Sequence, residues 1–318
     1  MEIDLFIKED YVKNNLKIAI GSWAFILGPY SSHPVPLEEV IKKLGKLGFD
    51  GIELAGFGIH AAPDQYPTRK DRERLLEITR ENGLEIPAYS ADLQTYPFAE
   101  GNQVIMQKHE DNFKKALDFC VDCNIPAIRV DTVTKTPFPD NLDYNTTWGR
   151  VITVFRKLAN KALSAGKTVL WEFEPGFIFN KPNEVVRLVE DVSSTCSNFK
   201  ILFDTSHAHM CAVIASKQIP PLDILKGGVV KFIELLRGKI GHVHLADSDN
   251  TLHDDDTSNH LPLGHGILDF KRILKSIQKS GYDSPWWSID LCFWPEAWQV
   301  VGESKSFLNT LFKELKWL

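Results

Sequence analysis

The sequence predicts a single (β/α)₈ TIM barrel, and two observations support this prediction. Short runs rich in β-branched and aromatic residues alternate with amphipathic helical segments, and the alternation occurs eight times. The β-rich runs are almost continuously apolar, as expected for parallel strands that are buried on both faces. Alternating strands and helices form parallel sheets, and eight such units favour a closed barrel.

The elements follow one another with little connecting chain. We expect strands over residues 17–23, 50–54, 86–90, 127–132, 168–174, 200–204, 240–246 and 287–291, and helices over 37–47, 69–82, 104–123, 147–165, 181–192, 222–236, 269–280 and 296–316. Gly48 ends the first helix, Pro182 stands in the first turn of the fifth, and Asp269 suits the N-cap of the seventh. No glycine-rich dinucleotide-binding pattern follows the first strand, so an open Rossmann sheet is not favoured.

Composition predicts one domain and an intracellular setting. The chain has 318 residues, 43% hydrophobic and 25% charged, and barrels of this size form single domains. We assign residues 1–15 to an N-terminal extension and residues 16–318 to the barrel. A net charge of −6 gives no sign of a nucleic-acid partner. Five cysteines, no apolar leader and no membrane-spanning stretch predict a cytoplasmic protein that does not bind membranes.

Two further patterns have ordinary explanations. Cys120 and Cys123 form a C-x-x-C pattern that is also found in redox and zinc sites. They lie in a helical-period run with no second pair, so we expect them to pack in a helix. The acidic run 254–256 could be a metal site, but such runs more often form solvated loops.

Ionisable residues gather at the predicted C-terminal ends of strands five to eight, where a barrel places its active site. Alternation puts the two glutamates of strand five on one side of that strand. The residues concerned are Glu172, Glu174, Asp204, His207, His209, His244, Asp247 and Asp290.

This gathering predicts a divalent metal site. Burying so many charges without a counter-ion would be costly, and a cation supplies one. We predict that Glu174, Asp204, His244 and Asp290 bind the metal. Three carboxylates and one imidazole suit Mn²⁺, with Mg²⁺ and Co²⁺ as alternatives. Hydrogen-bonded pairs and caps could explain any one of these residues, but they explain all four together less well.

Several motifs together resemble the xylose isomerase-like barrels, which include sugar isomerases and epimerases. They are Glu-Pro at 174–175, Asp-x-x-His at 204–207, Gly-His-x-His-x-x-Asp at 241–247, Leu-Pro-Leu-Gly-x-Gly at 261–266 and the segment 48–53. The resemblance covers the chain from about residue 17 onward. It implies the four metal ligands named above and a substrate contact for His207.

The sequence departs from that family at two points. The ligand on strand eight is usually Glu but here is Asp290, which is one methylene shorter. The loop after strand seven lacks the Arg that epimerases tend to carry. The shorter carboxylate argues against epimerisation by two bases on opposite faces of the substrate.

A narrower resemblance concerns segments 21–25, 171–177, 203–209 and 286–295. They are similar to the large catalytic subunits of bacterial C-glycoside deglycosidases. The resemblance implies cleavage of the carbon–carbon bond of a 3-oxo-glucoside, and pairing with a small β-sandwich subunit.

The expected chemistry is proton removal next to the carbonyl of a keto-sugar or glycoside, with the metal as Lewis acid. Candidate catalytic residues are His60, Glu172 and His207, although His60 could equally be a surface histidine. Candidate substrate-binding residues are Trp23, His209, Asp247 and His265.

Three other functions stay open. A sugar or sugar phosphate isomerase or epimerase would use the same site. An endonuclease of the AP type would need a zinc cluster with histidines from strands two and three, and strand three offers none. A non-catalytic sugar-binding barrel would tolerate the loss of metal ligands, and all four are present.

Overall fold

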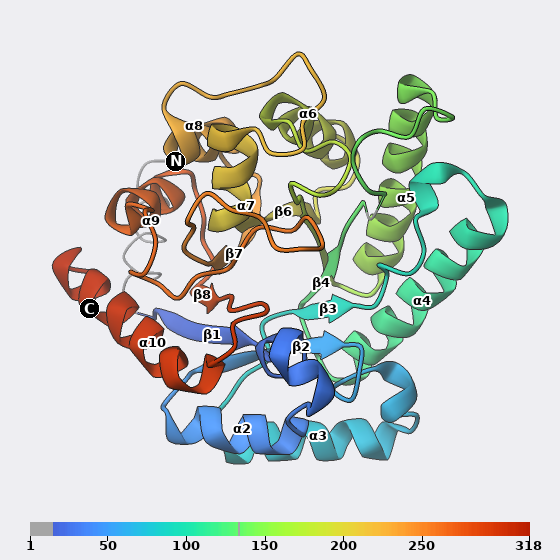
Figure 1. The fold of residues 1–318 in the computed structure, drawn as a ribbon. Helices are drawn as coiled ribbons and strands as arrows, with labels where there is room; N and C mark the ends of the chain where they lie inside the picture. Colours follow the sequence, from blue (N-terminus) through green and yellow to red (C-terminus); the bar gives the residue numbers. More distant parts are fainter. Residues whose placement is uncertain (1–14, 133) are drawn as a thin grey trace, which may run out of the picture.

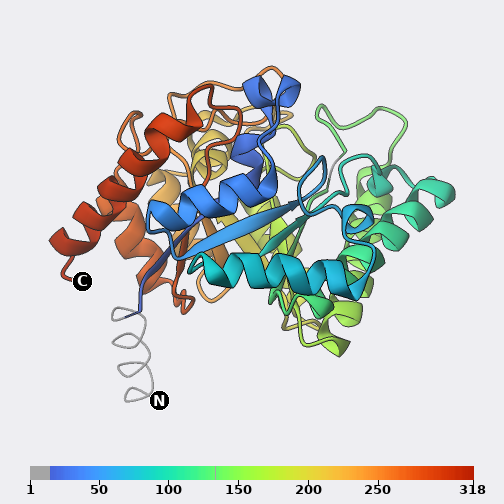
Figure 2. The ribbon, with the colours of Figure 1, turned by 90° about the horizontal axis from the view of Figure 1, so that it is seen from below.

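Eight parallel strands close into a barrel in chain order in the computed structural model, which describes residues 15–132 and 134–318. The helices surround the strands (Figure 1; Figure 2). The predicted TIM barrel is therefore confirmed. The strands are β1 Lys17–Gly21, β2 Gly51–Gly56, β3 Tyr89–Ala91, β4 Ala127–Val130, β5 Thr168–Glu172, β6 Phe199–Asp204, β7 Ile240–Leu245 and β8 Trp286–Ile289.

One long helix follows each strand and buries an apolar stripe against the barrel. Pro182 begins the fifth of these helices, and Asp269 caps the seventh by accepting a hydrogen bond from the Arg272 amide, as predicted. The helices are α2 Leu37–Lys46, α3 Arg69–Glu81, α4 Gln103–Asp122, α5 Tyr144–Ser164, α6 Pro182–Ser193, α8 Gly228–Leu235, α9 Phe270–Lys279 and α10 Ala297–Glu314.

The chain between β6 and α8 differs most from the prediction. A short helix, α7 Thr205–His209, follows β6 directly and continues as a π-helical turn over Met210–Ile214. The Asp204 side chain caps α7 by accepting from the His207 amide at 2.7 Å. The next helix begins at residue 228 instead of 222, because Gly227 and Gly228 both have positive φ angles.

Cys120 and Cys123 are free thiols buried in the hydrophobic core, as expected for packing residues. The predicted extension falls largely on residues 1–14, which lie outside the described part of the chain. Within the described part, no helix has both the length and the apolar character needed to cross a membrane.

Candidate functional site

Four buried side chains converge at the C-terminal end of the barrel. Each of them offers one ligand atom, and these atoms all lie within 4.8 Å of one another. We call this set the four-ligand group. It consists of Glu172 from β5, Asp204 from β6, His244 from β7 and Asp290 just after β8.

Contacts inside the group are short and are arranged around a common point. Nδ1 of His244 lies 2.9 Å from Oε1 of Glu172 and 3.4 Å from Oδ2 of Asp290. Oδ2 of Asp204 is buried and has no hydrogen-bond partner among the described residues. A buried carboxylate oxygen without a donor is costly, and a cation at this point would satisfy it. The residues therefore fit a divalent metal ion.

Glu172, and not Glu174, stands in this group, which differs from the predicted ligand set. On neighbouring strands, Glu172 is in register with Leu202, and Asp204 lies two residues further along β6. The strands of a barrel are tilted relative to its axis. Side chains that lie at the same height in the barrel therefore do not share a register position on neighbouring strands but are shifted along each successive strand. Alternation alone could not distinguish the two glutamates, because both point the same way.

Glu174 lies farther along the chain, beyond the end of β5. Its Oε1 is 2.9 Å from Nη2 of Arg129, and its Oε2 accepts a hydrogen bond from Thr257 at 2.9 Å. It belongs to a second potential metal-binding group with Glu172 and His207. Burial raises the pKa of Glu174 to about 8, against the lowering effect of Arg129.

Arg129 connects three carboxylates at the wall of the site, and the sequence analysis did not identify it. Its Nε lies 2.5 Å from Oε2 of Glu172 and 3.1 Å from Oδ1 of Asp131. Burial opposes its charge, but the carboxylates hold its pKa well above the ordinary value. Burial also acts to raise the pKa of Glu172, but Arg129 and His244 outweigh it and lower that pKa to about 2. One guanidinium cannot neutralise three carboxylates, so Glu174 retains its proton most readily.

A buried carboxylate contacts the ring nitrogen of His244 that points away from the four-ligand group. Oε2 of Glu53, on β2, lies 3.1 Å from Nε2 of His244, and its Oε1 lies 2.6 Å from Nε2 of His242. The other ring nitrogen of His244 faces the four-ligand group. Metal-binding histidines commonly have such a partner, which fixes the ring orientation and the tautomer.

Two histidines stand beside the group. Nδ1 of His207 lies 2.7 Å from the Ser258 hydroxyl, and the ring centroid lies 4.9 Å from that of His260. Burial lowers the pKa of His207 to about 3, so its imidazole is neutral. Nδ1 of His260 is 3.4 Å from Oδ1 of Asp290. Burial acts to lower the pKa of His260, but Asp290 and Asp204 outweigh it and raise that pKa to about 9.

A cavity of about 320 Å³ opens above these residues. Aromatic and aliphatic side chains form one part of its wall, and Trp23 also donates a hydrogen bond from Nε1 to Asp290 at 2.9 Å. Of the predicted residues, Trp23, Glu172, Glu174, His207 and Asp290 line the cavity. The remaining lining residues are Leu27, Phe57, Ser90, Ala91, Asp92, Gln94, Thr95, Arg129, Asp131, Asp255, Thr257, His260, Cys292 and Phe293.

Three predicted histidines belong neither to the lining of this cavity nor to the four-ligand group. His60 is fully buried, and its Nε2 lies 2.9 Å from the carbonyl oxygen of Val35, so it faces the protein interior. Nε2 of His209 lies 2.6 Å from the side-chain oxygen of Asn250. The His265 side chain is 46% exposed. Each follows a strand in the sequence, but the segment after that strand, helix α7 for His209 and a loop for the other two, directs the ring away from the cavity.

Asp247 also has a different role from the predicted substrate contact. Its carboxylate accepts hydrogen bonds from four backbone amides, those of Ser248, Gly264, Gly266 and Leu268, at 2.9–3.0 Å. These bonds fasten both ends of the segment 248–268. That segment carries Thr257, Ser258 and His260 to the cavity, so Asp247 shapes the site from outside it.

Several known proteins with similar sequences are enzymes. The chain is 25% identical to an inosose dehydratase of Lacticaseibacillus casei over 287 residues, 84% of this chain and 86% of that protein. It is 24% identical to a fructoselysine 3-epimerase of Escherichia coli O157:H7 over 261 residues, 78% of this chain and 83% of the other.

Solved structures show the same fold. D-psicose 3-epimerase from Clostridium cellulolyticum H10, in a structure with D-tagatose, superposes with a TM-score of 0.71 at 15% identity, over 93% of this chain and 99% of the other. The IolI protein with a bound zinc atom gives a TM-score of 0.72 at 16% identity, over 94% and 99%. Residues 41–308 match the family profile described as xylose isomerase-like TIM barrel. The chain therefore belongs to the xylose isomerase-like TIM barrel family.

Proposed function

We propose that the protein is a divalent-metal-dependent carbon–carbon lyase, a C-glycoside deglycosidase that releases the aglycone from a 3-oxo-glucoside. The observation that carries the proposal is the four-ligand group beneath a cavity of about 320 Å³. Glu172, Asp204, His244 and Asp290 would hold the metal, for which we propose Mn²⁺. When bound, the cation supplies a Lewis acid that polarises the carbonyl oxygen of the keto-sugar.

Glu174 is the group best suited to move the proton. Its carboxylate lines the cavity, and burial favours its protonated form in the metal-free protein, so it is suited both to take up and to release a proton. It takes the proton from the carbon next to the carbonyl. The electron pair of that bond forms a carbon–carbon double bond as the bond to the aglycone breaks, and Glu174 then gives the proton to the aglycone carbon.

Other cavity residues orient the substrate. The neutral imidazole of His207, held by Ser258, is placed to hydrogen-bond an oxygen of the sugar. Trp23, Phe57 and Phe293 line the cavity and offer apolar surface to a flat aglycone. His60 lies outside the cavity, so we assign it no part in the reaction.

The relatives support elimination next to a carbonyl. An inosose dehydratase eliminates water from its substrate, and the same proton removal can expel a carbon leaving group instead. Asp290, shorter than the usual Glu, also favours elimination over two-base epimerisation. A keto-sugar isomerase or epimerase is the second candidate, favoured by the likeness to fructoselysine 3-epimerase.

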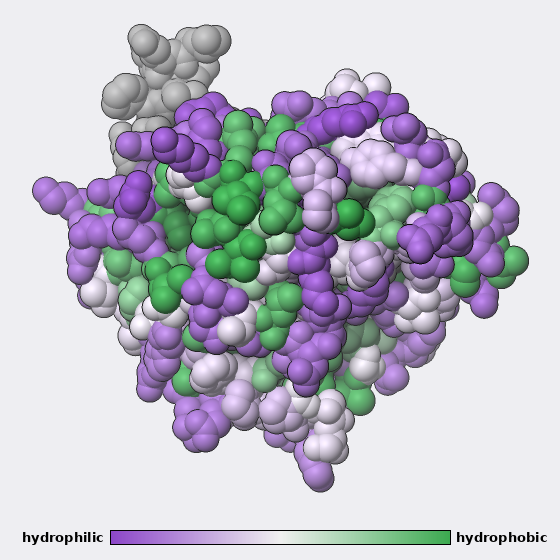
Figure 3. Space-filling model, turned by 45° about the horizontal axis from the view of Figure 1, so that its top comes forward, coloured by the Kyte–Doolittle hydropathy of each residue, from purple (hydrophilic) through white to green (hydrophobic). Residues whose placement is uncertain are grey.

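The resemblance to deglycosidases also implies a small β-sandwich subunit, and we include this partner in the proposal. Four apolar side chains between β6 and α8, namely Ile214, Ile219, Leu222 and Ile224, are 40–57% exposed. Figure 3, with the top of the molecule turned forward, shows hydrophobic side chains gathered on this face. Such a patch is suited to contact with another protein.

One pair of assays tests the function. Aglycone release from a 3-oxo-C-glucoside is measured with and without Mn²⁺, and with and without a co-expressed small subunit. Epimerisation of a free keto-sugar is followed in parallel. We expect release that stops when the metal is chelated. Epimerisation without any release would replace the lyase by the second candidate.

A further inference from the structure

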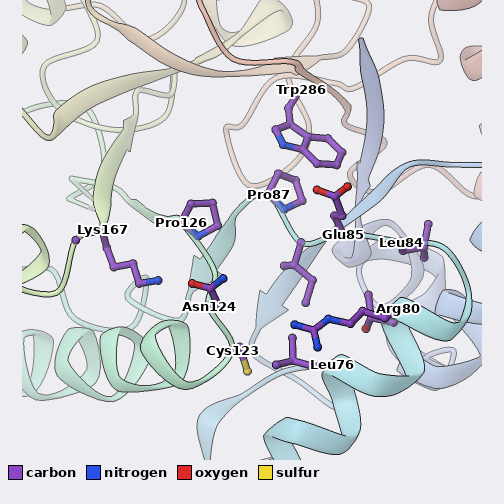
Figure 4. A pocket seen from close by; sticks show the side chains of 13 residues that line it. Leu76, Arg80, Leu84, Glu85, Pro87, Cys123, Asn124, Pro126, Lys167 and Trp286 are labelled. Atoms are coloured by element: carbon purple, nitrogen blue, oxygen red, sulfur yellow. The ribbon is translucent and has the colours of Figure 1, made fainter. Parts of the chain in front are cut away.

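A second cavity, of about 420 Å³, lies at the opposite end of the barrel. Its walls come from residues just before β3, β4 and β5, from the start of β8, and from α3 and the end of α4 (Figure 4). It shares no lining residue with the cavity at the candidate active site. Its residues belong to the face of the barrel that opposes the four-ligand group.

Lys167 is the unusual residue of this cavity. It is only 8% exposed, and among the described residues its ammonium has no hydrogen bond or ion pair. Its backbone is fixed, since its amide donates to Ala162 at 2.8 Å and its carbonyl accepts from Asn198 at 3.0 Å. Figure 4 shows the side chain reaching into the cavity toward Asn124. An ammonium that lines a cavity without an acidic partner is suited to contact an anionic ligand.

No residue of the cavity wall supplies that anion. Arg80 adds a second positive charge, and Figure 4 shows its guanidinium directed into the cavity. Glu85, the only acidic side chain in the lining, is ion-paired with Lys17. Burial raises the pKa of Cys123 to about 12, so this neighbour remains a neutral thiol. The cavity therefore has an excess of positive charge in a chain whose net charge is −6.

We propose that this cavity binds a small organic anion through its phosphate or carboxylate group, with Lys167 and Arg80 as the charged contacts. Lysine and arginine are the usual partners of these groups, and the Asn124 amide adds a neutral donor. The volume exceeds that of one anionic group. Pro87 and Trp286 provide apolar surface for the rest of the molecule. Because the two cavities are separate, the anion binds without displacing the substrate.

Calorimetric titration of the metal-loaded protein tests the proposal. One arm uses inorganic phosphate and the other citrate, both at constant ionic strength with chloride as the reference. We expect saturable binding in at least one arm, and the arm that binds more tightly identifies the anionic group. Lys167→Gln should weaken binding by about tenfold or more. Lys114→Gln, at a lysine 67% exposed on α4, is the matched control and should leave it unchanged.

A second variant covers the case in which Lys167→Gln does not fold. Arg80→Gln alters a more exposed side chain and should also weaken the anion by several-fold. To locate the site, lysine acetylation followed by peptide mass spectrometry should show that the anion protects Lys167. Absence of saturable binding in both arms overturns the proposal, and so does unchanged affinity in Lys167→Gln together with unprotected Lys167.

Discussion

The two ends of the barrel carry opposite unbalanced charge, and strand β5 connects them. Lys167 precedes this strand at one end, and Glu172 closes it at the other. Between the two ends, Ala88, Ala127, Leu170 and Leu202 form an apolar layer. At the C-terminal end the carboxylates outnumber Arg129 and the two histidines with raised pKa values, His244 and His260. At the N-terminal end Lys167 and Arg80 line a cavity whose one acidic side chain, Glu85, is already paired with Lys17. A folded chain tolerates such an excess where a ligand of the opposite sign completes the site.

The largest expected effect is on metal affinity, and it distinguishes Glu172 from Glu174 at the C-terminal end of the barrel. Glu172→Gln should weaken Mn²⁺ binding by more than about 100-fold, because it removes a direct ligand. Glu174→Gln, two residues further along the chain, should retain the metal but lose activity. Competition with a chelator measures the affinity of each variant. The opposite pattern would restore the sequence-based assignment of Glu174 as the ligand.

Removal of Arg129 should strongly destabilise the metal-free protein. Arg129→Met leaves Asp131, Glu172 and Glu174 without their counter-charge, which should cost about 3–5 kcal/mol of unfolding free energy. Arg129→Lys retains the charge and serves as the control. Urea unfolding after chelation measures both variants. Equal stability of the Met variant and the parent at pH 8 would show that the three carboxylates need no guanidinium.

Glu53→Gln should weaken metal binding less than loss of a ligand, by about 10- to 100-fold. The carboxylate holds Nε2 of His244 and favours the tautomer whose other nitrogen faces the metal. The glutamine keeps the shape of the side chain but removes its charge. Chelator competition on parent and variant measures the effect. An unchanged affinity would mean that strand geometry alone orients His244.

The raised pKa of Glu174 predicts a pH dependence of stability in the metal-free protein. Its folded pKa of about 8 lies above the ordinary value of 4.5. The protonated form is therefore favoured by folding, and its stabilising contribution is lost as the pH rises from 4.5 through 8. Glu174→Gln mimics the protonated form and should flatten this decline in Tm between pH 5 and 9. The effect should be smaller than that of Arg129→Met, because Glu174 keeps its partners. An undiminished decline in the variant would assign it to other groups.

The smallest expected effect is a gain in stability, and it concerns the cavity at the N-terminal end of the barrel. Lys167→Met removes a charge that has no acidic partner and adds apolar surface to the cavity wall, so it should raise the unfolding free energy by about 1 kcal/mol in chloride buffer. Added phosphate should stabilise the parent and not the variant. Thermal unfolding with and without phosphate measures both. Destabilisation of the variant in chloride buffer would mean that the ammonium already has a favourable environment.

Much of this molecule could be predicted from local sequence patterns. Each strand lies within a few residues of its predicted range, because alternation of apolar runs is a local signal. Asp204, His244 and Asp290 were predicted as ligands because each stands at a strand end, where a barrel places its active site, and the structure brings all three into the four-ligand group. The choice of Glu172 over Glu174 depends on the tilt of neighbouring strands, which no single strand reveals.

Other residues of the site carried no usable signal. Arg129 stands within an apolar strand. Its partner Asp131 follows two residues later, whereas Glu172 and Glu174 are more than forty residues away in the sequence. His260 lies in a polar loop, thirteen residues after Asp247, and reaches the cavity only because that loop folds back. His60 and His265 are the opposite case. Both follow a strand in the sequence, yet neither side chain lines the cavity. The path of a loop is fixed by tertiary contacts that sequence periodicity does not describe.

The four amide hydrogen bonds to Asp247 have a consequence for how ligands enter the site. They bring the two ends of the 21-residue segment 248–268 together on one carboxylate that is 1% exposed. The conformational entropy of this loop is therefore lost when the chain folds and not when a substrate arrives. Thr257, Ser258 and His260 await the ligand in place. The enzyme can then apply its binding free energy to the ligand itself, without first assembling that wall of the cavity.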